Sequence, residues 1–79
     1  MKQVKVKFIV APFDGVVAGK VYDAVLVPEG EDIIAALPEL SYVYGNEPVE
    51  TAQDCLCFVA DDGHPCDLFT DRANFEYVE

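Results

Sequence analysis

Apolar and polar residues alternate over the first ten positions of the chain. Val4, Val6, Phe8 and Val10 would share one face of a strand over Lys2–Val10, with lysines on the other face. Similar patterns, or short apolar runs between turn residues, predict four further strands: Val21–Val27, Cys55–Ala60, Cys66–Thr70 and Phe75–Val78. We therefore predict a mainly β protein in which five antiparallel strands form a small barrel.

A tight hairpin is expected near the middle of this pattern. Asp62 and Gly63 lie between two apolar runs, and Asp-Gly favours a two-residue turn. Such a turn pairs Val59 with Cys66 and puts Cys57 and Cys66 on one face as diagonal neighbours. We expect the core to contain ten residues of the five strands: Val4, Val6, Phe8, Tyr22, Leu26, Leu56, Phe58, Leu68, Phe69 and Phe75.

Two connections between strands are long. The loop Ala11–Lys20 contains Pro and Gly residues, and its Val and Phe side chains indicate that it folds back onto the barrel. The connection Pro28–Asp54 should contain structure of its own: a short helix over Glu31–Leu37 and a short extra strand over Ser41–Tyr44. We assign residues 1–79 to one domain with an acidic insertion at 28–54.

Charge is distributed unevenly along the chain. The protein has 15 acidic and 5 basic side chains, for a formal charge of −10. Residues 1–20 carry +3, and residues 21–79 carry −13. The negative electrostatic field of such a protein disfavours direct binding to nucleic acid or to an anionic membrane and favours binding to a basic surface on another protein. A solvated acidic surface without a partner would have the same composition. The candidate partner-binding residues are the seven acids of the insertion: Glu29, Glu31, Asp32, Glu39, Glu47, Glu50 and Asp54.

Six short segments outside the insertion resemble a known class of protein. They are the initial Lys-Val-Lys-Phe strand, Phe13–Gly15, Gly19–Ala24, Phe58–Gly63, Leu68-Phe69 and Asn74–Val78. In these segments the chain resembles small SH3-like barrel proteins encoded by phages and prophages, most of which have unknown function. The resemblance implies a five-stranded antiparallel SH3-like barrel with a short helix in a long insertion between strands 2 and 3. It carries over no functional residue.

The strongest metal-ligand pattern is the set Cys55, Cys57, His64 and Cys66. Residues two apart on a strand lie about 6.5–7 Å apart, whereas zinc needs sulfur atoms that converge on one point. We therefore expect core thiols, no bound metal and no cofactor. An odd number of cysteines without a secretory signal or an apolar span indicates reduced thiols and a cytoplasmic protein.

No catalytic constellation is present. His64 follows Asp61 and Asp62, but nothing in the pattern supplies a nucleophile, so we interpret it as a solvated turn residue and expect no enzymatic activity. Phe13 and the tyrosines are candidates for an aromatic groove that binds proline-rich peptides, although the chain lacks the tryptophan typical of such grooves.

Two functions from different classes remain. The first is a small acidic binding protein, of the kind that phages use as anti-restriction or anti-CRISPR inhibitors, which occupies a basic nucleic-acid-binding surface of a host protein. The second is a structural or accessory module of a phage or bacterial complex that docks through its surplus apolar residues.

Overall fold

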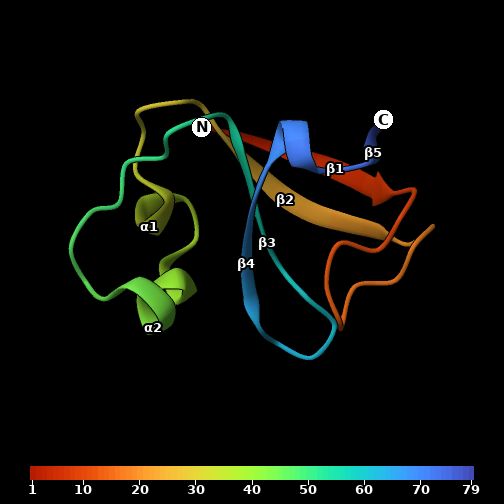
Figure 1. Cartoon of the computed structure of the whole chain (residues 1–79), viewed down its shortest axis with the longest axis horizontal. Coiled ribbons are helices and arrows are strands. Elements are labelled where there is room, and N and C mark those ends of the chain that lie inside the picture. The colour runs from red at the N-terminus through yellow and green to blue at the C-terminus, as the bar shows by residue number, and fades with distance from the viewer.

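A computed structural model describes the whole chain, Met1–Glu79. Five strands form one antiparallel sheet in the order β4-β3-β2-β1-β5 (Figure 1). The strands are β1 (Lys2–Phe8), β2 (Val21–Val27), β3 (Cys55–Val59), β4 (Pro65–Phe69) and β5 (Phe75–Val78). The mainly β prediction is thus confirmed. The edge strands β4 and β5 do not pair, so the sheet is open and hydrogen bonds do not close it into a barrel.

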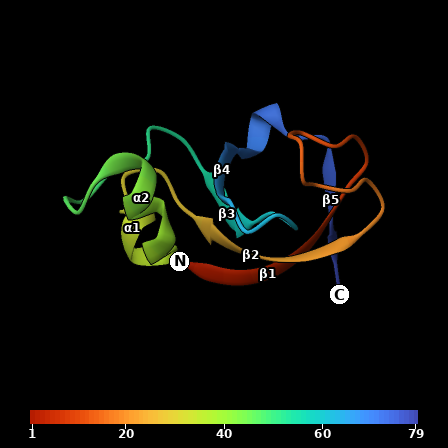
Figure 2. The same cartoon turned by 90° about the horizontal axis from the view of Figure 1, so that it is seen from below.

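The sheet curves around an inner core. Figure 2 shows it as a trough, with the first loop and the 3-10 turn η2 (Thr70–Arg72) over the open side. At the centre the rings of Phe8 and Phe58 lie 5.2 Å apart. Five of the ten expected core residues are buried here: Val6, Phe8, Tyr22, Leu56 and Phe58. The others are half-buried: Val4, Leu26, Leu68 and Phe75 pack against this core, and Phe69 packs against a second one.

The first strand is shorter than predicted. It ends at Phe8, and both Ile9 and Val10 are exposed. Its neighbour β2 begins at Val21, opposite Lys7, so Val10 has no cross-strand partner to pack against. Alternation alone cannot show where the partner strand stops.

The loop between β3 and β4 has three residues rather than two. Gly63 N donates to Ala60 O, and Ala60 N donates to His64 O, both at 2.9 Å, which leaves Asp61–Gly63 as the loop. Gly63 has a φ of 88°, and every residue with a positive φ in this chain is a glycine. In the predicted two-residue turn Asp62 would be the first central residue, and the turn types that suit hairpins need a positive φ at that position. The φ of Asp62 is not positive, so this turn does not form.

The additional loop residue moves the pairing of β3 and β4 by one position. Cys66 pairs with Phe58, and Cys57 pairs with Asp67. Because side chains alternate across a sheet, Cys57 and Cys66 lie on opposite faces. The prediction that they are diagonal neighbours on one face is therefore wrong.

The insertion covers the outer face of β2, β3 and β4 (Figures 1 and 2). It contains α1 (Ile33–Ala36), the 3-10 turn η1 (Pro38–Leu40) and α2 (Ser41–Tyr44). These elements bury Ile33 and Leu40 in a second core, together with Val27 and two cysteines of the sheet. The helix predicted within residues 31–37 is confirmed as the shorter α1.

The predicted strand over Ser41–Tyr44 is wrong, because this segment forms α2. Leu40, the last residue of η1, is helical, and α2 follows it without a break. The helix ends at Gly45, whose N–H donates to Ser41 O and whose φ is 87°. No neighbouring strand is available to this segment, so the β propensity of its Tyr and Val residues has no sheet in which to act.

Candidate partner-binding surface

The two ends of the insertion lie side by side. Gly30 N donates to Thr51 O at 2.8 Å, Thr51 N donates to Glu31 O at 2.9 Å, and Asp32 forms a β-bridge with Glu50. Residues near 30 and near 50 are thus brought together at the junction with the sheet. This pairing gathers five of the seven candidate acids at the base of the insertion: Glu29, Glu31, Asp32, Glu50 and Asp54.

Two of the seven acids hold the insertion together. Asp32 Oδ1 accepts from Ile34 N and from Val49 N, both at 2.9 Å, so it caps α1 and ties it to the returning chain. The hydrogen bond from Val49 N, and after it the one from Ile34 N, lowers the pKa of Asp32. Asp54 Oδ1 accepts from Glu29 N at 2.9 Å. Asp32 and Asp54 therefore help to hold the fold of the insertion.

The other five acids are exposed, as is Asp54. Glu31 pairs with the N-terminal ammonium group of Met1 at 3.4 Å, and the remaining four form no ion pair. Those four are Glu29, Glu39, Glu47 and Glu50. Glu39 lies in η1, and Glu47 lies in the segment after α2. The candidate acids are therefore divided between the base of the insertion and its helical part.

All three lysine ion pairs lie outside the insertion. Lys5 pairs with Asp23 at 2.7 Å, Lys7 with Glu76 at 3.7 Å, and Lys20 with Asp61 at 2.5 Å. These three lysines thus neutralise Asp23, Glu76 and Asp61, whereas Asp67 of β4 forms no ion pair. The insertion retains a negative charge that no lysine or arginine compensates.

Exposed apolar side chains accompany these acids. Tyr42 of α2 is 87% exposed and Val43 is 61% exposed. The next residue, Tyr44, donates its hydroxyl to both carboxylate oxygens of Asp67, at 3.0 and 2.9 Å, which fixes α2 to β4. Burial, followed by this hydrogen bond, raises the pKa of Tyr44 to about 12. The sequence interpretation missed this feature because it placed Ser41–Tyr44 in a strand.

The four metal-ligand candidates are not brought together. Cys55 and Cys57 are buried in the outer core, whereas Cys66 packs against the inner core and His64 is exposed in the hairpin. A hydrogen bond with the Cys55 side chain, followed by burial, raises the pKa of Cys57 and favours the neutral thiol. No three His, Cys, Asp or Glu side chains are arranged to hold one metal ion.

The imidazole of His64 pairs with a single side chain, that of Asp62. Its Nδ1 lies 2.9 Å from Asp62 Oδ2, and its backbone N–H donates to Asp62 Oδ1 at 3.2 Å. These two interactions lower the pKa of Asp62. The thiol of Cys66 donates to the backbone oxygen of His64 at 3.5 Å, whereas the imidazole itself pairs with Asp62.

A polar network joins the first loop to the same hairpin. Tyr22 donates its hydroxyl to Asp61 at 3.1 Å and accepts from Val17 N at 2.7 Å. Asp61 also accepts from Lys20, which lowers the pKa of Asp61 and raises that of Lys20. With the bond from Asp61 N to Gly15 O, 2.8 Å long, this network explains why the loop folds back as expected.

The aromatic residues do not form one groove. Phe13 lines a hollow of about 320 Å³ with Leu68, Phe69 and Arg72, but no tyrosine lines it. Tyr22 is buried, and the other tyrosines lie on α2 and β5. The structure thus separates the residues that a peptide groove of the expected kind would need together.

No protein-family model, curated protein or solved structure matched this chain. None of its helices has the length and apolar character needed to span a membrane.

Proposed function

We propose that this protein is a non-enzymatic binding protein and that its acidic insertion occupies a basic surface of another protein. The observation that carries the proposal is the location of the ion pairs. No lysine or arginine pairs with any of the seven acids of the insertion, whereas three of the eight acids outside it pair with lysines. A surface of this kind speeds association with a cationic partner and repels anionic ones.

Tyr42 and Val43 supply the apolar part of the proposed contact. Charged groups mainly set association rate and specificity, whereas a few desolvated aromatic side chains carry much of the affinity of an interface. Tyr42 is the most exposed large apolar residue of the chain and lies on the same insertion as the acids. The partner we propose is a host enzyme with a basic nucleic-acid path, which the insertion would block as a phage-type anti-restriction or anti-CRISPR inhibitor.

The test is affinity capture from bacterial lysate at low and high salt, with captured proteins quantified by mass spectrometry. A double variant, Glu47→Lys with Glu50→Lys, removes charge from the insertion, and Asp14→Lys with Glu79→Lys makes the same change in charge elsewhere. All four positions are exposed and form no ion pair. The proposal requires a protein that the parent and the Asp14/Glu79 variant capture at low salt but the Glu47/Glu50 variant does not. Equal capture by all three would contradict it.

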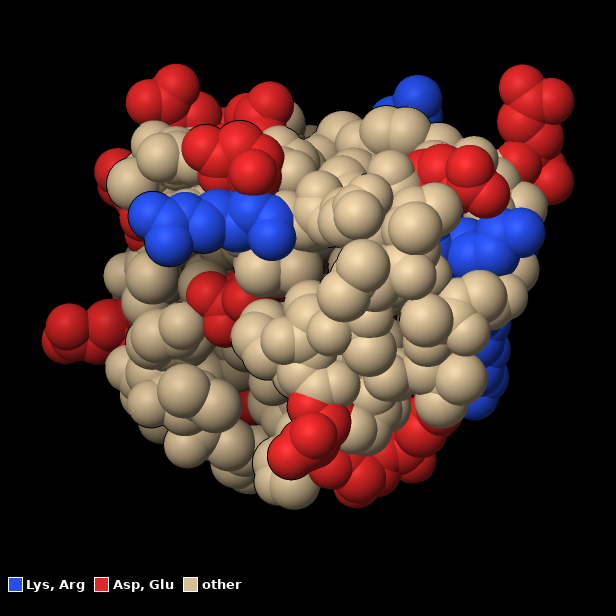
Figure 3. All heavy atoms as spheres, turned by 45° about the vertical axis from the view of Figure 1, so that its right-hand side comes forward, with Lys and Arg blue, Asp and Glu red and all other residues tan.

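A second candidate function is docking through an apolar surface on the first loop. Ile9, Val10, Phe13 and Val17 are all exposed. Figure 3 shows the side of the molecule that bears this loop, with charged side chains around a broad uncharged area. Such an interface would respond little to salt, whereas an electrostatic one weakens as salt rises. Capture that persists at high salt and is lost in Phe13→Ala would favour this second function.

We also propose that the curved sheet is a small SH3-like barrel. The support is its five antiparallel strands around one inner core, to which β4 contributes Leu68 and β5 contributes Phe75. The first loop and η2 would then complete the wall where hydrogen bonds do not. Side-chain NOEs between Leu68 and Phe75 in solution would support this, and their absence would contradict it.

A further inference from the structure

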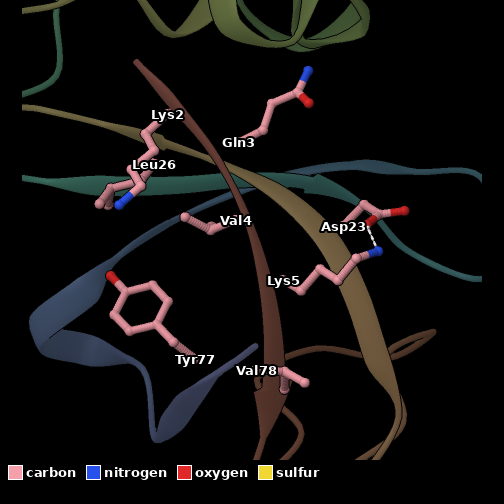
Figure 4. A pocket seen from close by; sticks show the side chains of 8 residues that line it. All are labelled: Lys2, Gln3, Val4, Lys5, Asp23, Leu26, Tyr77 and Val78. Atoms are coloured by element: carbon pink, nitrogen blue, oxygen red, sulfur yellow. Dashed lines mark hydrogen bonds and ion pairs between the residues drawn. The ribbon is translucent and has the colours of Figure 1, made fainter.

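Two hollows lie along the edges of strands, and they differ in how far the chain itself fills them. The one beside β1, of about 650 Å³, has Tyr77 and Val78 of β5 in its lining (Figure 4). Val78 pairs with Lys5, so Glu79 of the same chain lies opposite Val4. The chain's own β5 therefore occupies that edge. The edge of β4 has no such cover, because β4 pairs only with β3 (Figure 1).

The hydrogen bonds at the two ends of β4 show which of its residues face β3. Ala60 N donates to His64 O at 2.9 Å, before the strand, and Thr70 N donates to Asp54 O at 3.0 Å, after it. Between them β3 and β4 pair residue by residue, without a bulge. In an antiparallel ladder the groups that face one neighbour recur at every second residue. The even-numbered residues of β4 therefore face β3, and the odd-numbered ones face away from it.

The free edge thus presents the backbone groups of Asp67 and Phe69. Neither residue forms a backbone hydrogen bond with any part of the chain outside the pairing with β3. Pro65, the remaining odd-numbered residue of β4, has no N–H to donate. An antiparallel strand added to this edge would exchange two hydrogen bonds with Asp67 and two with Phe69.

The second hollow, of about 320 Å³, lies along this free edge. Its lining consists of three consecutive residues of β4, one residue of the first loop and one of η2: Asp67, Leu68, Phe69, Phe13 and Arg72. Successive side chains of a strand point to opposite faces of the sheet. A hollow that touches three consecutive residues therefore lies beside the strand rather than over one of its faces.

The side chains around this hollow indicate which segment it accepts. Leu68 packs on the inner core and Phe13 is exposed beside it, so an apolar residue suits the position opposite Leu68. Asp67 forms no ion pair, and its carboxylate accepts only from the Tyr44 hydroxyl. A basic residue therefore suits the position opposite Asp67. Arg72 follows β4 at its other end, where it disfavours a second cation.

The charge of the whole molecule decides between two kinds of occupant. A second copy could pair its own β4 with this edge, but two molecules that each carry a formal charge of −10 repel one another. The same field attracts a basic segment. The observations therefore favour a segment of another protein over a second copy of this chain.

We propose that the free edge of β4 binds an extended basic segment of another protein by strand addition. The segment runs antiparallel to β4 and exchanges backbone hydrogen bonds with Asp67 and Phe69. Its apolar residue packs on Leu68 and Phe13, and the lysine or arginine that follows contacts the carboxylate of Asp67. This site is distinct from the acidic insertion and goes beyond the function proposed above.

The probe is the peptide acetyl-Val-Ile-Lys-Thr-amide, added to 15N-labelled full-length protein and followed by amide NMR shifts. Its Val would lie opposite Phe69, its Ile opposite Leu68 and its Lys opposite Asp67. We expect saturable shifts of the Asp67 and Phe69 amides, because these N–H groups gain acceptors. If the peptide causes no saturable shift of these two amides, the proposal is wrong.

Two N-methylated peptides test the backbone pairing without changing any side chain. A methyl group on the Lys nitrogen removes the donor to Asp67 O, and this peptide should bind about tenfold more weakly or not at all. The Ile opposite Leu68 directs its N–H away from β4, so a methyl group there should leave the affinity unchanged. Equal affinities of the two N-methylated peptides would overturn the proposal.

Substitution of Asp67 tests the charged contact. Asp67→Asn removes the charge but retains an oxygen that accepts from Tyr44. It should weaken binding of the Lys peptide about two- to fivefold and leave binding of a peptide with Gln in place of Lys unchanged. Equal loss for both peptides would contradict the contact between Lys and Asp67. Shifts of the Asp67 and Phe69 amides that depend on protein concentration alone would also overturn the proposal, because a second copy would then be the occupant.

Discussion

At Gly15 the backbone of the first loop lies against the hairpin, where its oxygen accepts from Asp61 N. It has a φ of +86°, and a Cβ built there would lie 2.9 Å from the carboxyl carbon of Asp62. Gly19 has nearly the same φ, +84°, but nothing lies within 4 Å of its Cβ position. Substitutions at the two glycines can therefore distinguish the free-energy cost of a left-handed conformation, which both share, from the cost of a close contact, which only Gly15 has.

We predict that Gly15→Ala destabilises the protein more than Gly19→Ala. Each substitution should cost about 1–2 kcal/mol for the left-handed conformation. Only Gly15→Ala also displaces Asp62 from its interactions with His64. Urea denaturation of the two variants gives the comparison. In an Asp62→Ala background the difference should disappear, and a difference that persists would show that the contact with Asp62 is not its cause.

The sequence predicted a turn at Gly15 and another at Gly63, but it did not predict that the first loop and the hairpin would be in contact. Asp14-Gly15 and Asp62-Gly63 are both recognisable as turn dipeptides. Their approach depends on the bond from Asp61 N to Gly15 O, which joins residues 46 positions apart. Local patterns carry no information about such a distant pairing.

At the scale of elements, Asp32 has a structural role that its charge alone did not predict. It was expected to bind a partner, but its carboxylate accepts two backbone hydrogen bonds inside the insertion. An acid at the start of a predicted helix indicates a cap, and the helix at 31–37 was predicted. The bond to Val49 could not be predicted, because it requires knowledge of how the insertion returns to the sheet.

We predict that Asp32→Ala lowers the melting temperature more than Asp32→Asn, because asparagine retains an oxygen that can accept from Ile34 and Val49. The lowered pKa of Asp32 also implies a dependence on pH. Its stabilisation is present above the unfolded-state pKa, near 4, and is lost as the pH falls toward the lower folded-state value. Thermal melts should therefore show a smaller loss of stability below pH 4 in Asp32→Asn than in the parent. Parallel pH profiles would contradict this role.

A second prediction concerns the attachment of the insertion to the sheet. Leu40 is fully buried in the outer core, whereas Val43 in the next element is largely exposed. Leu40→Ala should cost about 2–5 kcal/mol, because it removes buried methyl groups and leaves a cavity. Val43→Ala should change the free energy of unfolding by no more than about 0.5 kcal/mol. Similar effects of the two substitutions in urea denaturation would show that the insertion does not pack as described.

At the scale of the whole molecule, composition predicted that the electrostatic field is negative, but it did not predict where on the surface the uncompensated charge lies. The separation of charge between residues 1–20 and the rest is visible in the sequence. The local neutralisation of Asp23, Glu76 and Asp61 is not, because each of them meets its lysine across strands or loops. The order of the strands in the sheet is a second feature of the whole molecule that the sequence did not predict. Periodicity predicted five strands, but it could not show that the edge strands β4 and β5 remain unpaired.

The central claim is that the uncompensated charge of the insertion drives binding to a basic partner. The most direct measurement is the association rate with the captured partner, over a range of salt, for the Glu47/Glu50 and Asp14/Glu79 lysine variants. Both change the formal charge of −10 by the same four units. We predict that the Glu47/Glu50 variant associates more slowly than the Asp14/Glu79 variant at low salt and that the difference shrinks as salt rises. Equal rates for the two variants at every salt concentration would contradict the claim.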